Sequence, residues 1–348
     1  MSNARATHLT RRGILAAGGA LGLGAVLAAC GDDDANSGGS GKETAAAQSG
    51  PWSFKDDRGQ TAKAGKVPSN IVAFIGAAAA LHDYGVQVKG VFGPTRTKDG
   101  KPDVQAGDLD ITKVTSLGNE WGQFNIEKYA SLAPDLLVTT TFDDAGTLWY
   151  VPEESKDKIA AVGAPSVAVS VYDRQLTQPL QRMLELARTL GADVTSKKIT
   201  DAKKRFEDAS ARLRAAAKAK PDIKVMAGSA SQDLFYVSGT NLSIDLEYFK
   251  ALGVNFVEPP EEVKAEGGWY ESLSWENVDK YGADIIMMDD RSSAIQPADI
   301  GEGTWKKLPA VKAGQVISRS PEPILSYDKC VPMVENLAKA IENAKKVS

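Results

Sequence analysis

One sequence pattern recurs in both halves of the chain at a constant spacing, and it limits the folds that the chain can adopt. The segment 127–138, Glu-Lys-Tyr-Ala-Ser-Leu-Ala-Pro-Asp-Leu-Leu-Val, is matched 149 residues later by 276–287, Glu-Asn-Val-Asp-Lys-Tyr-Gly-Ala-Asp-Ile-Ile-Met. Further along, Ile-Ala-Ala-Val at 159–162 is matched by Leu-Pro-Ala-Val at 308–311, again 149 residues away. A register that is kept without a gap predicts two copies of one structural unit.

Each copy has the pattern of a helix, a short turn, a buried strand, a second helix and a second strand. Residues 136–138 and 285–288 are continuous apolar runs, which is typical of parallel strands covered on both faces. Strands that alternate with helices indicate an α/β fold. We therefore predict two Rossmann-like lobes with parallel sheets and a ligand cleft between them, at the carboxyl ends of the strands.

A long helix is predicted between the two copies. Apolar residues recur there every three or four positions, and Pro221 ends the pattern. An ordinary helix of one lobe is the alternative, but the segment lies where the repeat requires a boundary. We expect a first lobe at 51–192, a linking helix at 193–219 and a second lobe at 220–348.

The first 29 residues have the features of an export signal of the twin-arginine type. Arg11 and Arg12 precede an uncharged stretch, 13–29, that is short and rich in glycine for a permanent membrane helix. The stretch ends in Leu-Ala-Ala-Cys, which resembles the bacterial lipobox, so Cys30 is predicted to be lipidated. Ile14 replaces the phenylalanine usual after a twin-arginine pair, which leaves a general secretory signal as the alternative. Residues 30–50 read as a flexible tether.

Composition excludes several classes of protein. The formal net charge is −4 and the pI is near 5.5, which argues against nucleic acid as a partner. The chain has two cysteines, Cys30 and Cys330, and two histidines, His8 and His82. Lipidation of Cys30 would leave Cys330 without a partner, so no disulfide is expected. With His82 alone after the signal, a site for a bare transition metal is not expected either.

Several motifs together resemble one family. They are Ile-Val-Ala-Phe at 71–74, Leu-His-Asp-Tyr-Gly-Val at 81–86, Asn-Ile-Glu at 125–127, and the stretch 305–316 that begins Trp-Lys-Lys-Leu-Pro-Ala-Val. Their order and spacing resemble the substrate-binding lipoproteins of ABC importers, in the class with a single linking helix that serves ferric siderophores, haem and cobalamin. The resemblance implies a monomeric two-lobed clamp without catalysis or cofactor, anchored by lipid outside the bacterial cell membrane. Its implied partners are a permease dimer with its ATPase.

The expected ligand is a ferric siderophore, of hydroxamate type by preference, because iron must arrive already chelated. A chelate with flat faces requires aromatic walls and fixed cations. Residues of these types follow the predicted strands, and we expect them to contact the ligand. They are Trp121, Phe142, Tyr172, Arg174, Tyr236, Trp269, Tyr270, Arg291, Arg319 and Tyr327.

Glu127 and Glu276 open the two copies of the repeat. An acidic residue in the first turn of a helix interacts favourably with the helix dipole, and this accounts for both residues without a further role. The resemblance implies more, since the matching glutamates of the family engage arginines of the two permease subunits.

Three other functions stay open at this stage. Haem or cobalamin could be the ligand within the same family. A sensory or adhesion lipoprotein could use the same clamp. A lipid-anchored hydrolase on an α/β scaffold is disfavoured, because no nucleophile and base occur together in a known motif.

Overall fold

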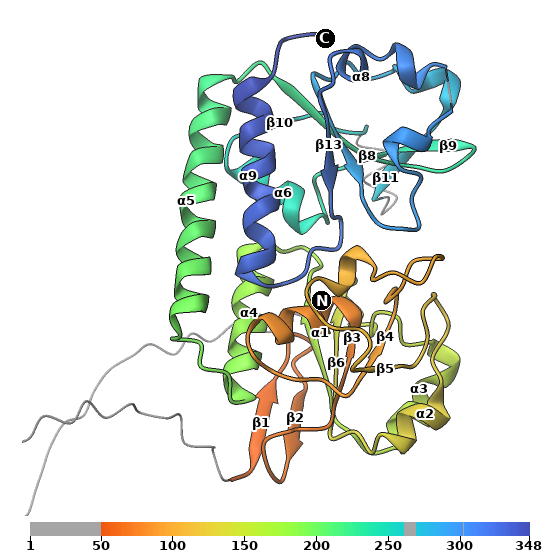
Figure 1. The fold of residues 1–348 in the computed structure, drawn as a ribbon, viewed down its shortest axis with the longest axis vertical. Helices are drawn as coiled ribbons and strands as arrows, with labels where there is room; N and C mark the ends of the chain where they lie inside the picture. Colours follow the sequence, from red (N-terminus) through yellow and green to blue (C-terminus); the bar gives the residue numbers. More distant parts are fainter. Residues whose placement is uncertain (1–49, 261–268, 302) are drawn as a thin grey trace, which may run out of the picture. The chain divides into compact units, whose positions relative to one another are not determined.

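In chain order, one large β-sheet comes before a long helix and another comes after it, as the repeat predicts (Figure 1). The computed structural model describes residues 50–260, 269–301 and 303–348. The predicted export signal, Cys30 and the tether up to residue 49 lie outside the described residues. The described residues all belong to one compact unit.

The first sheet is entirely parallel, with the strand order β5-β4-β3-β6-β7. All the residues of β3 and β6 are buried, because helices cover both faces of these central strands. The strands are β3 (Ile71–Phe74), β4 (Gly90–Phe92), β5 (Thr115–Ser116), β6 (Leu136–Thr141) and β7 (Ser166–Ser170), preceded by a hairpin of β1 (Trp52–Lys55) and β2 (Thr61–Ala64). The helices are α1 (Ile75–Asp83), η1 (Val104–Ala106), α2 (Ile126–Ser131), η2 (Glu153–Ser155), α3 (Lys156–Ala161) and α4 (Thr177–Thr189).

The second sheet is mixed, which corrects the expectation of two parallel sheets. Its main order is β11-β9-β8-β12-β13, and β9 runs antiparallel to both of its neighbours. Residues 231–233 join β8 to β9, and so short a connection can only form a hairpin. The strands are β8 (Lys224–Ala230), β9 (Leu234–Ser238), β10 (Asn255–Phe256), β11 (Tyr270–Ser274), β12 (Ile285–Asp289) and β13 (Val316–Arg319).

The two helices of the repeat are shorter in the second lobe, where η3 and α8 correspond to α2 and α3. The repeat predicts a helix from Glu276, but the structure has only the 3-10 helix η3 there. Asn277 and Asp279 stand where the first copy has Lys128 and Ala130, and asparagine and aspartate have lower helix propensities than lysine and alanine. The helices are α6 (Ile244–Ala251), η3 (Trp275–Asn277), η4 (Pro297–Asp299), η5 (Trp305–Lys307), α8 (Pro309–Lys312) and α9 (Tyr327–Asn343).

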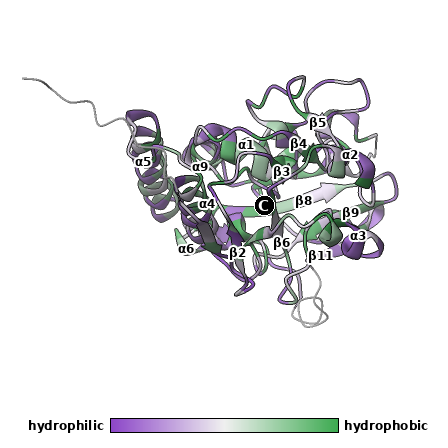
Figure 2. Ribbon diagram, turned by 90° about the horizontal axis from the view of Figure 1, so that it is seen from below, coloured by the Kyte–Doolittle hydropathy of each residue, from purple (hydrophilic) through white to green (hydrophobic). Residues whose placement is uncertain are grey.

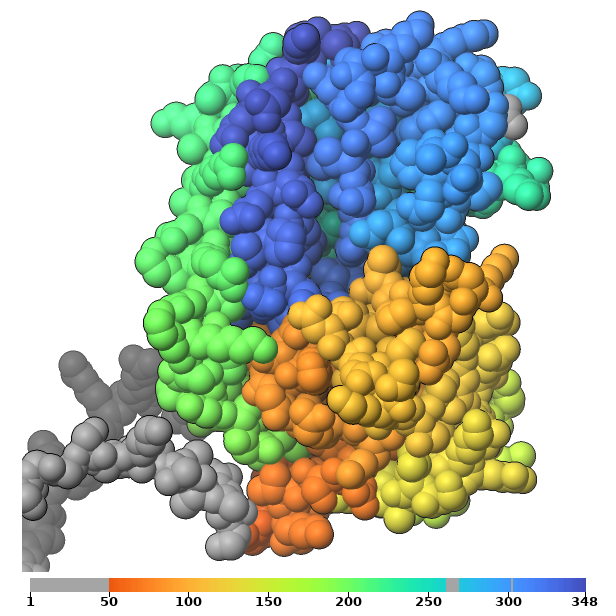
Figure 3. Space-filling model, viewed as in Figure 1, coloured from red at the N-terminus to blue at the C-terminus, as the bar shows by residue number. Residues whose placement is uncertain are grey.

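Helix α5 (Lys197–Ala219) is the predicted linking helix, and α9 runs beside it (Figures 1 and 3). Phe206 of α5 packs against Tyr327 of α9, and Arg212 forms a 2.6 Å ion pair with Glu342. The residues of α5 that are not buried against the rest of the protein are mostly hydrophilic (Figure 2). Helix α5 is thus the one helix of the described chain that joins the two lobes in sequence, and α9 packs along it.

Helix α9 is attached to both lobes. At its start, Ser326 donates a hydrogen bond to Asp83 of α1, and the backbone N–H of Tyr327 donates to the hydroxyl of Tyr84 at 3.3 Å. Just after its end, the backbone N–H of Lys345 donates to Gln315, next to β13, at 2.7 Å.

The repeat has a structural counterpart in two aspartates. Asp135 precedes β6 and accepts the backbone N–H of Asn70 at 2.8 Å; Asp284 precedes β12 and accepts that of Lys224, also at 2.8 Å. Each carboxylate therefore holds the start of the neighbouring central strand. Asp284 is fully buried and also accepts a hydrogen bond from Lys346 at 2.9 Å.

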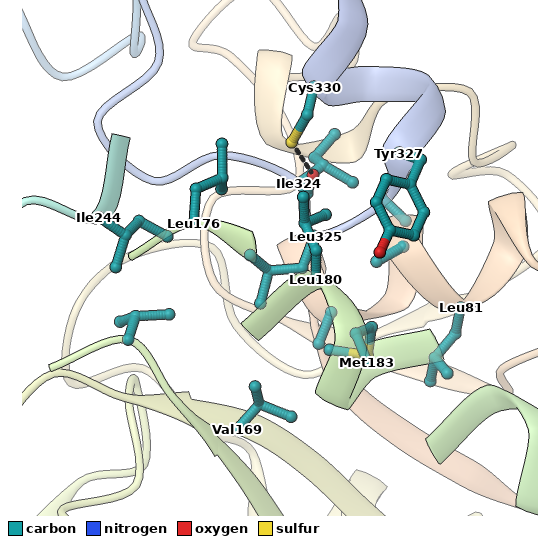
Figure 4. Packing of buried hydrophobic residues seen from close by; sticks show 14 of the residues in the cluster. Leu81, Val169, Leu176, Leu180, Met183, Ile244, Ile324, Leu325, Tyr327 and Cys330 are labelled. Atoms are coloured by element: carbon teal, nitrogen blue, oxygen red, sulfur yellow. Dashed lines mark hydrogen bonds between the residues drawn. The ribbon is translucent and has the colours of Figure 1, made fainter. Parts of the chain in front are cut away.

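The larger hydrophobic core extends from the first lobe through α5 and α9 to α6, β8 and β12 of the second lobe. Figure 4 shows Leu325 and Cys330 among residues of the first lobe, including Leu180 and Met183. The thiol of Cys330 is a free thiol that donates to the carbonyl of Ile324, and burial raises its pKa. It is therefore a packing residue. Among the described residues, no helix has the length and apolar character needed to cross a bilayer.

Candidate functional site

A cavity of about 810 Å³ lies between the two sheets, beyond the carboxyl ends of their strands. Loops after β5, β6 and β7 form one wall, and residues at the ends of β8, β12 and β13 form much of the other. This is the position in which open parallel sheets bind ligands. The volume lies within the range of small-molecule sites.

The wall from the first lobe is aromatic. Trp149 occupies its centre, with ring centroids 4.8 Å from Trp121 and 4.3 Å from Phe142. Trp121 leaves 63% of its surface exposed, which is unusual for so large an apolar side chain. Tyr150 packs behind these rings with a φ of 59°, a left-handed conformation that is strained for a tyrosine. Burial and the negative charge of Glu322 raise the pKa of Tyr150 to about 12.

The wall from the second lobe combines an aromatic pair and Trp269 with polar groups. Tyr236 and Tyr270 meet edge to face at 4.9 Å, and Tyr270 is half exposed. Trp269 reaches toward the first lobe, with its ring centroid 6.1 Å from that of Phe142. The polar lining of this wall consists largely of serines: Ser229, Ser231, Ser238, Ser243 and Ser293.

Arg291 lies between two carboxylates in the cavity wall. Its Nη2 donates to Asp289 at 2.7 Å and its Nη1 donates to Glu322. Burial alone would lower the pKa of Arg291, but the hydrogen bond to Asp289 and the charge of Glu322 outweigh it and raise the pKa. The guanidinium therefore stays charged, and its charge is balanced within the protein.

Arg319 is also paired. Its Nε and Nη2 donate to the two oxygens of Asp245 at 2.7 and 2.9 Å, and both side chains are almost completely buried. A bidentate pair of this kind fixes the guanidinium plane. Nη1 of Arg319 donates to Ser238, another residue of the cavity wall, at 3.2 Å.

Most of the residues expected to contact ligand line this one cavity. They are Trp121, Phe142, Tyr236, Trp269, Tyr270, Arg291 and Arg319. Trp269 is described, although the preceding Gly267 and Gly268 lie outside the described residues.

Three others do not line it. Tyr327 is buried in the packing of α9 against α5, because it is the first residue of α9 and not part of the strand-end loop. Arg174 is exposed in a separate groove beside the start of α4, where its guanidinium donates to the carbonyl of Asp173. Tyr172 is half buried and lies outside the cavity lining.

Among the cavity-lining residues that were not predicted from the sequence are Trp149, Asp289 and Glu322. Trp149 follows β6 by eight residues, too far to be assigned to a strand end from a pattern. Asp289 is the last residue of β12, where a carboxylate in an apolar run signals a polar strand end. Glu322 stands between Pro321 and Pro323, and this sequence could have marked a rigid segment.

Glu127 lies in the first turn of the α-helix α2, as predicted, whereas Glu276 lies in the short 3-10 helix η3. Asn125 caps α2 by accepting the backbone N–H of Lys128 at 2.8 Å, and Glu127 follows it. Glu276 is exposed in η3, and hydrogen bonds from its own backbone N–H and from Ser274 lower its pKa.

Comparisons with known proteins agree with this architecture. The family model described as periplasmic binding protein matches residues 75–323. A search of curated proteins gave no match.

Solved structures give closer relatives. The chain is similar to DesE, a ferric-siderophore receptor protein from Streptomyces coelicolor, with 78% identity over 85% of this chain and 100% of that chain and a TM-score of 0.84. It shares its fold with SirA from Staphylococcus aureus complexed with staphyloferrin B, at 20% identity over 84% of this chain and 98% of that one, TM-score 0.59. It also shares its fold with FhuD2 from the same organism with bound ferrioxamine B, at 20% identity over 78% of this chain and 98% of that one, with a TM-score of 0.52.

Proposed function

Because this chain belongs to the periplasmic binding protein family, we propose that it is the ferric-siderophore receptor of an ABC uptake system, with a neutral or cationic ferric hydroxamate as its ligand. The relationship to the ferric-siderophore receptor protein DesE, at 78% identity over its whole length, supports the ligand class. The cavity between the lobes supplies a binding site of suitable size.

The balance of charge in the cavity favours a hydroxamate. Its charged lining residues are Asp143, Asp289, Glu322, Arg291 and Arg319. Both arginines are paired with carboxylates, so the described wall is acidic on balance. A ferric trihydroxamate is electrically neutral, whereas a ferric tris-catecholate is a polyanion that this wall would repel. This charge balance is the observation on which the choice of hydroxamate depends.

A titration followed by tryptophan fluorescence tests the proposal. Trp121, Trp149 and Trp269 line the cavity, so a ferric complex bound there quenches their emission. We expect saturable quenching by a ferric trihydroxamate, and none at the same concentration by its iron-free form or by a ferric tris-catecholate. Quenching by haem or cobalamin alone would instead support the alternative ligands. His82 lies in α1, outside the cavity lining. It is therefore not placed to ligate the metal of haem or cobalamin in this cavity.

The proposal includes attachment to the membrane through Cys30. The lipobox-like sequence and the tether of 30–50 support a receptor that works at the outer face of the cell membrane. In cells, Cys30→Ala is expected to leave the protein uncleaved or released and without a lipid label. A variant that still partitions into detergent with a lipid label would exclude this anchor.

Delivery to a permease through Glu127 and Glu276 completes the proposal. One glutamate stands at the corresponding place in each lobe, which suits a partner with two-fold symmetry. The family relationship supports this role.

A further inference from the structure

Glu322 occupies a position in which one carboxylate contacts both lobes. It lies in the segment between β13 and α9, flanked by Pro321 and Pro323. Pro321 fixes its own φ, and Pro323 restricts the residue before it to extended conformations. The backbone therefore presents the Glu322 side chain from a stiff support, and only 10% of that side chain is exposed.

The hydrogen bonds of Glu322 come from opposite sides of the cavity. Trp149 and Gln105 of the first lobe donate to Oε2 at 3.1 and 3.2 Å. Arg291 of the second lobe donates to Oε1. The same carboxylate thus holds the central indole of the aromatic wall and the guanidinium of the polar wall.

Glu322 also supplies the second negative charge beside Arg291. Asp289 accepts hydrogen bonds from both the backbone N–H and the guanidinium of Arg291, and also accepts one from Ser229. With Asp289 alone, the positive charge of Arg291 would be balanced by one carboxylate, which also accepts a hydrogen bond from Ser229. With Glu322 added, the cluster that faces the ligand is negative.

We propose that Glu322 is a specificity-determining residue that makes the cavity reject polyanionic ferric complexes by neutralising Arg291. The inference rests on the proposed function, because it concerns the ligand class of the same cavity. Removal of this one charge should leave Arg291 available to a polyanionic ligand while changing the fit to a neutral ligand little.

The test measures the affinity of one variant for two ferric complexes of different charge. Glu322→Gln keeps the shape of the side chain and an oxygen that can accept from Trp149, but removes the charge. We expect the ratio of dissociation constants, ferric tris-catecholate over ferric trihydroxamate, to fall by at least about tenfold. The affinity gained for the polyanion should decrease as the salt concentration is raised, because salt screens the electrostatic attraction between the polyanion and Arg291.

Two further variants separate this effect from a structural one. Glu322→Asp keeps the charge and should keep most of the wild-type ratio. In the double variant Glu322→Gln with Arg291→Gln, the affinity gained for the polyanion should disappear, because Arg291 is its source. Glu120→Gln is the matched control: it removes an exposed acid next to Trp121 that does not contact Arg291, and should move the ratio less than about twofold.

Several results would overturn the inference. An unchanged ratio in Glu322→Gln, or an equal change in Glu120→Gln, excludes specific neutralisation. If Glu322→Gln does not fold, Arg291→Gln serves instead, and an affinity for the polyanion that does not fall below wild type excludes the role. The proposed function fails separately, if wild-type protein binds no ferric hydroxamate.

Discussion

The two walls of the cavity come from copies of one repeat, yet they differ in chemistry. The first lobe contributes a cluster of rings around Trp149, with Asp143 as the charged group in its lining. The second lobe contributes the aromatic residues Tyr236, Trp269 and Tyr270 as well, but adds serines and two paired arginines. The scaffolds correspond even in small details, because Asp135 and Asp284 hold the start of the central strand in each.

This difference indicates a division of labour. Aromatic rings provide contact area at low entropic cost and tolerate ligands of varied outline. Paired charges in a buried wall are costly to displace, so they select among ligands by charge. We therefore expect the aromatic residues of both lobes to set affinity and the charged groups of the second lobe to set specificity, whereas Glu127 and Glu276 should act alike.

The largest effect is expected for Glu127 and Glu276. Replacing both Glu127 and Glu276 by alanine should abolish siderophore uptake in cells, because each lobe would lose its contact with the permease. Reversal of either charge should impair uptake more than its neutralisation, since like charges repel across an interface. Uptake of radioactive ferric siderophore measures this.

Ligand affinity is the control for that experiment. The double variant should bind ligand within about twofold of wild type, because both residues lie outside the cavity lining. Normal uptake would leave the two glutamates as residues that favour helix starts.

The next largest effect concerns stability of the second lobe. Arg319→Ala leaves Asp245 buried without its partner, which should lower the free energy of unfolding by about 3–5 kcal/mol. Denaturant unfolding measures the loss, and Asp245→Asn in the same chain should restore part of it. Arg174→Ala, at an exposed position, should change stability by less than about 0.5 kcal/mol. Equal losses in Arg319→Ala and Arg174→Ala would contradict the stabilising role assigned to the buried pair of Arg319 and Asp245.

Affinity should respond to the aromatic residues. Trp269→Ala should weaken ligand binding by about 1–3 kcal/mol if its indole is a ligand wall, and Trp121→Ala in the other lobe tests the same role at an exposed position. Isothermal titration with a ferric trihydroxamate gives both values. A loss confined to Trp269 would restrict the aromatic contribution to the second lobe, and no loss with an intact fold would make both residues structural.

The smallest effect distinguishes Asp284 from Asp135. Burial alone would raise the pKa of Asp284, but hydrogen bonds from the backbone of Lys224 and Val347 and from Lys346 outweigh it and hold the pKa well below its usual range. Because the pKa is lowered on folding, Asp284 stabilises the protein above the ordinary carboxyl value of about 4, and this contribution declines as pH falls below it.

Asp284→Asn should therefore lower the free energy of unfolding by about 1–3 kcal/mol at neutral pH, and by less near pH 2.5. Asp135→Asn is the matched variant and should cost less, since Asp135 is only half buried. Thermal unfolding at the two pH values measures this, and a loss independent of pH would contradict the assigned cause.

The sequence was informative where residues near each other in the chain decide the structure. The repeat predicted β6, β12 and the linking helix, because buried parallel strands and amphipathic helices have distinct apolar patterns. The tight connection between β8 and β9 was missed, since a short apolar strand gives no sign of its direction. Glu322 and Trp149 are 173 residues apart, and their contact depends on how the lobes pack, which no local pattern contains.

The attachment of α9 to the first lobe has a consequence for the order of folding. Ser326 donates to Asp83 across 243 residues of chain, and Leu325 and Cys330 belong to the same core cluster as Met183. During synthesis the first lobe emerges well before these residues do, so part of its core stays open until α9 has left the ribosome. A chaperone that shields apolar surface would find its target on the first lobe during that interval. The last helix therefore governs when the earlier half of the protein is complete.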